Sequence, residues 1–576
     1  MKNSSTSLMK GILLCMGGMF ILFGLLRSFL GADLYDEALY IGDPFIVAHG
    51  STPYVNNWLQ TPGFSFFLAP VVALYEVFVP THQGIFLFMR LFFLVAKILM
   101  YVGICILFRK SKYKYAVRLI ALPLIANFFG MIPAFNYTNI PLIGTFLAGM
   151  LVLYQWNYQR HEKIFPVISG ILLACSTLCS PTQILNCLLF CVFYFVFVDK
   201  KSCVRYVLGG LASALVFSLY MMIKAGSLTN LIHSFETLLK HPYFSFGHST
   251  LSWQAYQIFP MAIGSVLLYF VCALIMELFR RCTGKKNSLI WSCKMGLITG
   301  AFVGLIYNFI RYEQYPLWNR VIILLSVGAF FFRCLPSDRA IHKLVDFVAI
   351  PEMVTFLGMA LTVYGGAAGR FYVFVPMALI CLAYIYNALS EYWDERCIYL
   401  TAIYVGMFAA VMIKYEFYTI YGEFTEDSRF LAPTELTCRV DEGIYAGLYT
   451  TSEKAEAVQE LEEYLRLNTS RDEYVLFLDR APMAYLMTDA QPCTSTSWDP
   501  QLYSEDYRGE TKMLEDYFDT VQRVPDKVIY IQTRETEKIS IEQNDYKFND
   551  YINQNYSLQD TSKIGNSYRV IIYKRK

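Results

Sequence analysis

The chain has 576 residues, of which 56% are hydrophobic and 16% aromatic, and its mean hydropathy is +0.39. Repeated apolar runs of about 17 to 25 residues can cross a bilayer, so this composition excludes an ordinary soluble protein and predicts a polytopic α-helical membrane protein. The net charge of +2 hides two opposite parts, because residues 415–576 hold 30 of the 46 acidic and 18 of the 48 basic residues. We therefore expect a transmembrane domain over 1–414 and an acidic soluble domain over 415–576.

The first predicted membrane span is Leu8–Leu30. Lys2 and Lys10 lie at its start, which places the amino terminus in the cytoplasm by the positive-inside rule. Because it has no small-residue cleavage site, we interpret it as a retained helix rather than a signal peptide. The next apolar segment, Gly63–Val79, is interpreted as lying on or dipping into the outer leaflet, since a crossing there would place the basic cluster at 109–114 outside.

Further apolar segments predict the remaining spans of the transmembrane domain. Together with the first span they give about 13 crossings, which places the basic loops between them in the cytoplasm and the C-terminal domain outside it. The outer loops are then 31–83, which would hold juxtamembrane helices, and 224–256, with short turns at 311–318 and 365–370. The predicted spans are 84–108, 116–133, 138–158, 164–180, 182–198, 204–223, 257–279, 289–310, 318–335, 344–363, 371–389 and 396–414.

Beyond Lys414 the hydropathy falls and short strands alternate with amphipathic helices, which predicts a small extracytoplasmic α/β domain. Helices are expected over 452–468 and 514–521, and strands over 473–480, 526–533 and 567–576. Cys438 and Cys493 are the only cysteines after Lys414. An exported domain permits a disulfide, so we expect these two to pair if the region is outside the cytoplasm.

The outer loop 31–83 contains an acidic pair, Asp36-Glu37, in a stretch without Lys or Arg. Carboxylates held near a low-dielectric medium cost free energy and usually serve a function. On a helix the two would point about 100° apart, so that one can face a cavity while the other holds a supporting partner or a metal ion. Desolvation raises the pKa of such a carboxylate and suits it to accept a proton. The alternative is that both acids, with Asp33 and Asp43, only solvate an outer loop.

The order of motifs in this loop and the following span resembles the first outer loop of GT-C superfamily glycosyltransferases. The most similar are bacterial family-39-type enzymes, the relatives of protein O-mannosyltransferases and aminoarabinose transferases. A weaker similarity is Gly369-Arg370-Phe371-Tyr372 before Pro376, which is like the start of a late span in that family. The motifs are Tyr35-Asp36-Glu37-Ala38, His49-Gly50, Pro53-Tyr54, Thr61-Pro62-Gly63 and Met89-Arg90-Leu91.

The resemblance implies a GT-C-like fold with Asp36 as catalytic base and Glu37 beside it. It also implies substrate contacts from four residues of the motifs, namely Tyr35, His49, Tyr54 and Tyr372. It allows a divalent cation near the acidic pair, although no cofactor is required. The chain departs from the family at Gln60-Thr61, where many relatives carry a Lys or His, so no phosphate contact is assigned to that position. The acceptor class is not transferred from any one relative.

A sugar donor on a polyprenyl phosphate needs cations at the membrane surface, because the leaving phosphate gains charge as the bond breaks. On the outer side the candidates are Arg370, Arg311 and Arg320, with Arg90 at the outer end of its span. Each could instead be an interfacial anchor whose charged end reaches the headgroups. No nucleotide-binding glycine loop occurs on the cytoplasmic side, which argues against a nucleotide-sugar donor and against ATP-driven transport.

Together these features predict an inverting glycosyltransferase in a bacterial cytoplasmic membrane. It would move a sugar from a polyprenyl-phosphate donor to a lipid, glycan or protein acceptor on the outer face, with membrane lipids but no nucleic acid as partners. Asp33→Asn and Asp43→Asn are expected to serve as controls for Asp36→Asn. One alternative is an O-antigen polymerase- or ligase-like glycan transferase. The other is a lipid or glycan flippase or transporter, which favours charges deep within the spans, whereas the acids noted here lie at the surface.

Overall fold

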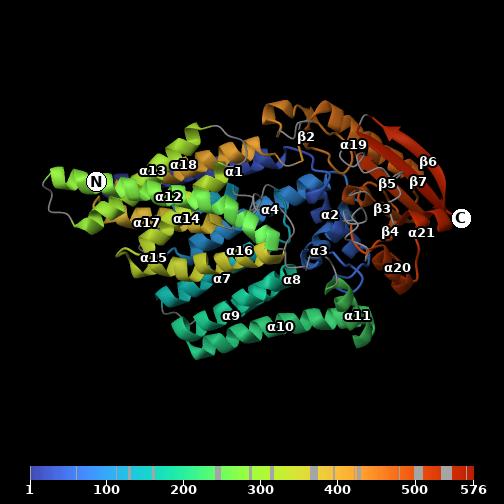
Figure 1. Ribbon diagram of the computed structural model, residues 1–576, viewed down its shortest axis with the longest axis horizontal. Coiled ribbons are helices and arrows are strands. Elements are labelled where there is room, and N and C mark those ends of the chain that lie inside the picture. Colours follow the sequence, from blue (N-terminus) through green and yellow to red (C-terminus); the bar gives the residue numbers. More distant parts are fainter. Residues whose placement is uncertain are drawn as a thin grey trace.

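The computed structural model shows a long molecule with a helical bundle at one end and a β-sheet at the other (Figure 1). The two chain termini lie at opposite ends of the view. The residues that the structure describes are 2–59, 61–111, 113–126, 132–158, 163–239, 248–283, 288–311, 317–362, 374–393, 396–420, 422–423, 430–478, 481–497, 510–533, 548–565 and 567–576.

The region up to Tyr418 is helical wherever regular structure is described, apart from an isolated β-bridge at each of two loops. Short 3-10 or π-helical turns join some of these helices, such as η1 (Pro181–Gln183) and η2 (Tyr194–Val198) on either side of α9. The helices are α1 (Lys2–Ser28), α2 (Asp36–Ala48), α3 (Gly63–Phe78), α4 (Ile85–Leu107), α5 (Lys114–Ala121), α6 (Pro123–Ala126), α7 (Asn139–Tyr158), α8 (Ile164–Cys179), α9 (Ile184–Phe193), α10 (Lys200–Ala225), α11 (Leu228–Leu239), α12 (His248–Cys282), α13 (Leu289–Ile310), α14 (Leu317–Arg333), α15 (Arg339–Leu344), α16 (Ile350–Thr362), α17 (Val375–Ser390) and α18 (Cys397–Tyr418).

Many of these helices are suited to a bilayer. Within the described ranges, eight helical segments are long and apolar enough to cross a membrane, as expected for a polytopic helical membrane protein. The total of about 13 crossings stays a prediction. The eight segments are Leu8–Ser28, Ile85–Leu107, Asn139–Tyr158, Pro181–Val198, Lys200–Ala225, Ile258–Cys282, Leu289–Ile310 and Cys397–Tyr415.

Two predicted spans differ from a single regular helix. The segment expected over 116–133 is divided at Leu122 into α5 and α6. Pro123 explains the break, because proline lacks the N–H that would continue the helical ladder and its ring clashes with the preceding turn. The segment expected over 344–363 begins earlier, in α15, and continues into α16 through a π-helical turn, η4 (Val345–Ala349).

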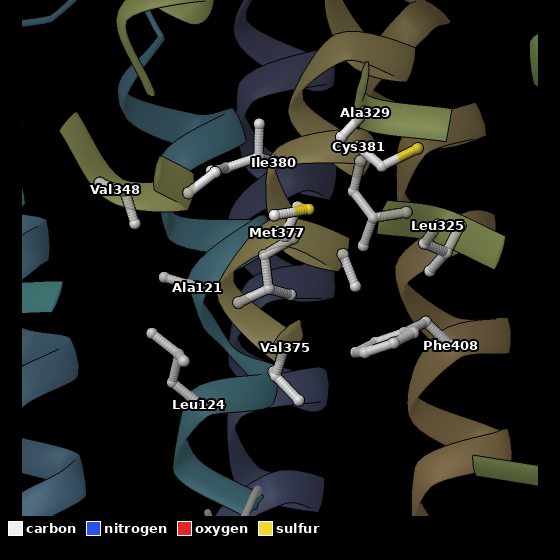
Figure 2. Close-up of a cluster of buried hydrophobic side chains, with 14 of the residues drawn as sticks. Ala121, Leu124, Leu325, Ala329, Val348, Val375, Met377, Ile380, Cys381 and Phe408 are labelled. Carbon is white, nitrogen blue, oxygen red and sulfur yellow. The ribbon is translucent and has the colours of Figure 1, made fainter. Parts of the chain in front are cut away.

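The core of the bundle is a cluster of buried apolar side chains that come from helices far apart in the sequence (Figure 2). Within a membrane such helices associate mainly through close packing and not through exclusion of water. Residues from α5, α6, α14, η4, α17 and α18 meet here, namely Ala121, Leu124, Leu325, Ala329, Val348, Val375, Met377, Ile380, Cys381 and Phe408.

After α18 the chain forms a mixed five-stranded sheet in the order β4-β3-β5-β7-β6. Strands β4, β3 and β5 are parallel, whereas β7 is antiparallel to both β5 and β6. A separate two-stranded sheet pairs β1 with β2. The elements are β1 (Cys438–Arg439), β2 (Tyr449–Thr450), α19 (Ser452–Asn468), β3 (Tyr474–Leu478), η8 (Pro482–Tyr485), β4 (Gln491–Pro492), α20 (Glu510–Val521), β5 (Lys527–Thr533), α21 (Phe548–Asn555), β6 (Tyr556–Ile564) and β7 (Tyr568–Arg575).

Local pattern accounts for most of this region. The predicted helix over 452–468 is confirmed as α19, and the predicted strands are confirmed as β3, β5 and β7. β5 lies in the middle of the sheet with Val528–Ile531 fully buried, as expected for an apolar strand covered on both faces. The sequence analysis did not predict β6, which alternates exposed and half-buried polar residues, or the two-residue strand β4.

The loop 31–83 packs with the C-terminal region. α2 and α3 lie between the bundle and the sheet (Figure 1), and their buried side chains share one hydrophobic core with α19, β3 and η8. The backbone N–H of Gly31 donates to Tyr449 O at 2.8 Å, and Trp58 N–H donates to Ser495 O at 2.8 Å. This loop and the C-terminal sheet therefore form one packed unit, although the sequence assigned the loop to the transmembrane domain.

Segments that the sequence places on one side of the membrane meet in space. The hydroxyl of Ser234, in α11, donates to Val55 O at 2.8 Å, so the outer loops 224–256 and 31–83 are in contact. On the other predicted side, the Tyr113 hydroxyl bonds to Asp338 Oδ2 at 2.5 Å and joins two basic loops. These contacts agree with the predicted grouping of the loops into two sets. Which set lies in the cytoplasm and which outside it remains a prediction.

The prediction that Cys438 and Cys493 form a disulfide is wrong. Cys438 and Cys493 are both free thiols. Cys438 lies in β1 and contacts the core shared with α2 and α3, whereas Cys493 is buried in a second core with Leu476, Tyr517 and Tyr530. The two cysteines belong to different cores, and counting cysteines in the sequence could not reveal this.

Candidate functional site

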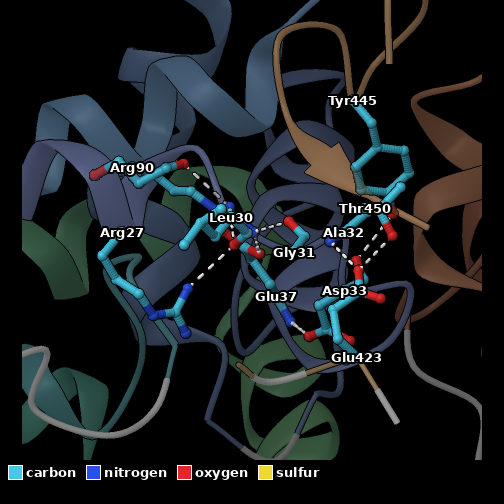
Figure 3. A network of polar contacts seen from close by, with 12 residues as sticks. Arg27, Leu30, Gly31, Ala32, Asp33, Glu37, Arg90, Glu423, Tyr445 and Thr450 are labelled. Atoms are coloured by element: carbon cyan, nitrogen blue, oxygen red, sulfur yellow. Dashed lines mark hydrogen bonds and ion pairs between the residues drawn. The ribbon is translucent and has the colours of Figure 1, made fainter. Parts of the chain in front are cut away.

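The centre of the site is an ion pair between Glu37 and Arg90 that is almost completely buried (Figure 3). Nε of Arg90 donates to Glu37 Oε1 at 2.7 Å and Nη2 donates to Oε2 at 2.5 Å. The remaining N–H groups donate to the carbonyls of Ser28, Leu30 and Gly31 at 3.1, 3.0 and 2.8 Å. All five donors of the guanidinium are occupied, so Arg90 has none left for a donor phosphate.

This pair fixes the backbone that follows the first membrane helix. The carbonyl of Ser28 ends α1, and those of Leu30 and Gly31 belong to the turn that follows. Glu37 lies in the first turn of α2, while Arg90 comes from α4. A planar guanidinium holds a carboxylate and several carbonyls in one fixed geometry, which a lysine cannot do. We therefore assign Arg90 and Glu37 a positioning role and not the phosphate and catalytic contacts expected from the sequence.

Asp33 caps the first turn of α2. Its Oδ1 accepts from the N–H of Tyr35 at 3.0 Å and its Oδ2 from the N–H of Glu37 at 2.6 Å, which satisfies helix N–H groups that have no partner within the helix. The side chain is buried. Burial first, and then the nearby charge of Asp36, raise the pKa of Asp33 to about 7, although the two N–H bonds act in the opposite direction.

Asp36 is the first residue of α2 and is half-buried, whereas Glu37 beside it is 1% exposed. The two side chains therefore differ in accessibility, as the 100° step between neighbouring helix residues predicts. A carboxylate at a helix N-terminus is also favoured by the helix dipole. Of this acidic pair, Asp36 is the residue whose position allows contact with a substrate.

Asp43 is fully buried and joins three parts of the chain. Nδ2 of Asn57 lies 3.1 Å from each of its carboxylate oxygens, and Ser65 Oγ donates at 2.5 Å. Ser497, from the C-terminal region, contacts Oδ1 through its N–H at 3.4 Å and its hydroxyl at 3.3 Å. Burial raises the pKa of Asp43 and these hydrogen bonds oppose the rise.

The acids of this loop are therefore not a solvated surface. Asp33 and Asp43 are both buried and accept hydrogen bonds from other groups of the loop, so they cannot serve as neutral controls for Asp36. The expectation that these acids lie at the surface is wrong for Asp33 and Asp43. Both carboxylates are hydrogen-bonded, as a buried charge requires.

Two buried charged residues near the ion pair were missed by the sequence analysis (Figure 3). Glu423 Oε1 accepts from Ala32 N–H at 2.7 Å, from the Thr450 hydroxyl at 2.7 Å and from Lys454 Nζ at 3.3 Å. Arg27, in the last turn of α1, donates to Leu30 O at 3.1 Å. Arg27 could have been noted as a cation at the outer end of the first span, but Glu423 gives no local signal.

The proposed substrate contacts lie in different surroundings. Tyr35 is half-buried beside Asp33. His49 follows α2, its Nδ1 is 2.9 Å from Phe45 O, and its ring is partly exposed. Tyr54 is buried and its hydroxyl bonds to Leu178 O at the end of α8, so it serves to hold the loop on the bundle. Tyr372 lies outside the described residues.

The motif glycine Gly63 explains how the loop reaches α8. A Cβ added to Gly63 would lie 2.0 Å from Leu178 O and 3.0 Å from Cys179 N. Because both atoms belong to backbone, no side-chain movement could relieve this contact. The motif is thus explained by close packing of α3 on α8, in addition to its resemblance to the family.

The phosphate candidates other than Arg90 are at the ends of α13 and α14. Arg311 follows α13 and bonds to the Tyr307 hydroxyl. Arg320, in the first turn of α14, lines a groove of about 670 Å³ between α12, α13 and α14, whose walls are mainly apolar. Asn308, in the same wall, has an Oδ1 atom that is buried and has no hydrogen-bond partner among the residues that the structure describes. Arg370 lies outside the described residues.

Among the described residues, no group of three or more His, Cys, Asp and Glu side chains could hold a metal ion. Asp36 and Glu37 would be the carboxylates available to a divalent cation, but the oxygens of Glu37 are already bonded to Arg90. The geometry that these residues do provide is one accessible carboxylate on a rigid turn, which suits proton transfer.

Comparison with known proteins adds no family to this geometry. No protein-family model matches the chain, and no curated protein matches it at a significant level.

Proposed function

We propose that the protein is a membrane glycosyltransferase of the GT-C type that uses a polyprenyl-phosphate sugar as donor. The observation that carries the proposal is the contrast between half-buried Asp36 and the buried Glu37–Arg90 pair. Glu37 and Arg90 fix the turn, and Asp36 is held at the start of α2 where a substrate can reach it. A base positioned by neighbours that do not themselves react is what general-base catalysis requires.

In the proposed reaction Asp36 accepts the proton of the acceptor hydroxyl or amine. The acceptor atom then forms a bond to the anomeric carbon of the sugar, while the bond from that carbon to the phosphate oxygen breaks. The polyprenyl phosphate leaves with the bonding electrons and so gains negative charge. A single displacement of this kind inverts the anomeric centre. Transfer would take place on the outer face, on the side of the membrane to which we assign the sheet domain.

The groove beside Arg320 supports a lipid-linked donor. Its volume of about 670 Å³ and its mainly apolar walls suit part of an isoprenoid chain, and Arg320 supplies a positive charge at the helix end for a phosphate. Asn308 offers an unpartnered acceptor in the same groove. Arg320 and Arg311 both follow from the sequence as phosphate candidates, and Arg320 lines this groove.

Arg320→Gln is expected to raise KM for the polyprenyl-phosphate donor by about tenfold or more, with a smaller change in kcat. The reason is that loss of a charge-assisted bond to phosphate, worth about 1.5–3 kcal/mol, weakens donor binding. Initial rates with purified protein in nanodiscs, measured against donor concentration, provide the test. Arg439→Gln, at an exposed arginine, is the matched control. Equal KM values for both variants would exclude Arg320 from the donor site.

A second candidate, a lipid or glycan transporter, is favoured by one specific observation. Glu352 in α16 is fully buried, and within the described part of the chain neither of its carboxylate oxygens has a hydrogen-bond partner. Lys97 in α4 is also buried. Ionisable residues within membrane helices often belong to transport pathways. Glu352→Gln therefore separates the two candidates, because a transporter should lose flux of labelled lipid across vesicles, whereas a glycosyltransferase should keep its transfer rate.

A further inference from the structure

His82 has an unusual position between α3 and α4. Its side chain is 4% exposed, and its backbone has φ of 57°, which is uncommon for a residue other than glycine. Nδ1 lies 3.0 Å from the carbonyl oxygen of Leu486, in the C-terminal region, and Nε2 lies 2.9 Å from Glu76 Oε1. Surroundings that hold a residue in a costly conformation are frequently functional.

The two hydrogen bonds of His82 determine how many protons His82 and Glu76 hold between them. A carbonyl oxygen only accepts hydrogen bonds, and so does an ionised carboxylate. Both ring nitrogens must therefore carry a proton, or else Glu76 must carry one and donate it to Nε2. In either case the pair holds one proton more than a neutral histidine beside an ionised glutamate. Loss of that proton would leave a nitrogen lone pair facing an acceptor oxygen.

His49 completes the group on the other side of Glu76. Its Nε2 is 3.5 Å from the same Oε1 atom, and its Nδ1 is 2.9 Å from Phe45 O. The Phe45 ring packs against both imidazoles, with centroid distances of 4.1 Å to His49 and 5.1 Å to His82. We call His49, Glu76 and His82 the His82 cluster.

Helix α19 brings the remaining charged groups that face the cluster. Burial raises the pKa of Glu462, and the nearby Arg466 and His82 lower it. Nη2 of Arg466 donates to Glu462 Oε1 at 2.9 Å and to Thr81 O at 2.9 Å. Because Glu462 is paired with Arg466, the carboxylate that shares a proton with His82 is that of Glu76.

The cluster lies at the contact between α2, α3 and the C-terminal sheet. A Cβ added to Gly42 in α2 would lie 2.6 Å from Pro482 O, at the start of η8. Leu486, which follows η8, is fully buried and supplies the carbonyl that faces His82. The segment 482–486 is therefore held between tight backbone packing on one side and the His82 hydrogen bond on the other.

We propose that the His82 cluster is a proton-dependent contact that holds the C-terminal sheet domain on the loop of the candidate site. Above the ordinary pKa of histidine the closed contact keeps one proton that the separated parts would release. By linkage, the state that binds more protons is favoured at low pH. The contact is thus complete under acidic conditions and weakens as the pH rises. This proposal concerns conformation alone and does not depend on the proposed glycosyl transfer.

Hydrogen exchange of the full-length protein in nanodiscs tests it. We expect the protection factors of amides in 483–490, corrected for intrinsic exchange rates, to fall about tenfold or more between about pH 5.5 and about pH 8.5, either side of the ordinary pKa of histidine. Glu76→Gln should remove this dependence, because a glutamine amide can donate to unprotonated Nε2 and still accept from a second donor. Its contact should therefore stay closed at both pH values.

His82→Gln is a second variant. It removes the titrating ring, so it should show no pH dependence either, though with lower protection of 483–490 at every pH. His342→Gln, at a histidine that bonds to Tyr384 within the bundle, is the control and should behave as the wild-type protein does. The proposal is overturned if wild-type protection does not change with pH, or if Glu76→Gln and His82→Gln both keep the wild-type change.

Discussion

Asp36→Asn is expected to reduce sugar transfer by about a hundred- to ten-thousand-fold, the range that a general base usually contributes. Asparagine keeps the size and the helix N-terminal position of Asp36 but cannot take up the proton of the acceptor. Since the side chain is half-buried and not part of the Glu37–Arg90 pair, the variant should fold and insert normally. The measurement is release of polyprenyl phosphate from a series of polyprenyl-phosphate hexoses and pentoses by purified protein.

The control for this variant must remove the same charge without disturbing the loop. Asp441→Asn fits, because the Asp441 side chain is 78% exposed and its ion-pair partner, Arg439 at 4.0 Å, is itself 61% exposed. It should transfer sugar at the wild-type rate. Asp33→Asn and Asp43→Asn are expected to lower stability as well as activity, because each carboxylate is buried and accepts several hydrogen bonds. If Asp36→Asn transfers sugar as well as Asp441→Asn does, Asp36 is not the base.

Arg90→Ala and Glu37→Ala are each expected to destabilise the protein by about 3–5 kcal/mol, because removing one partner leaves the other charge buried and unpaired. For Arg90→Ala the carbonyls of Ser28, Leu30 and Gly31 also lose their donor. Arg90→Lys should recover little of the loss, since an ammonium group cannot reproduce the planar arrangement of five donors. Thermal unfolding followed by thiol labelling of the buried cysteines provides the readout.

The matched control for this pair is Arg439→Ala, which removes an arginine from a solvent-exposed ion pair with Asp441. Exposed pairs are screened by water and contribute little, so no measurable change is expected. An unfolding temperature for Arg90→Ala equal to that of Arg439→Ala would contradict the positioning role. Activity separates the two roles further, because Glu37→Gln at a temperature where it remains folded should lower kcat by misplacing Asp36, without a change in the pH profile.

Local sequence patterns determined the helical membrane character and several elements of the C-terminal region. Apolar runs depend only on neighbouring residues, so spans such as Ile85–Leu107 and Leu289–Ile310 were predicted within a few positions. The same holds for α19 and β3, where helical or strand periodicity is strong. Pro123 interrupts one apolar run, and proline disfavours a continuous helix. The prediction of a single span over 116–133 followed the hydropathy and overlooked this proline.

The candidate site shows what the sequence could determine only in part. The acidic pair was recognised from its unusual composition, but not the division of roles between its members. That division depends on Arg90, which lies 53 positions after Glu37. Arg90 donates all five of its N–H groups, to the Glu37 carboxylate and to three backbone carbonyls. Contacts at such separation leave no periodic signal, because they arise from how helices pack.

Only the tertiary structure decided which parts of the chain act together. The burial of Asp43 by Asn57, Ser65 and Ser497 joins the loop to a segment more than 400 residues later. His82 likewise meets Leu486 across 404 positions. Hydropathy and charge place segments relative to a membrane, since these are properties of single stretches. Which buried polar groups satisfy one another is fixed by packing, because a donor and its acceptor need only be close in space.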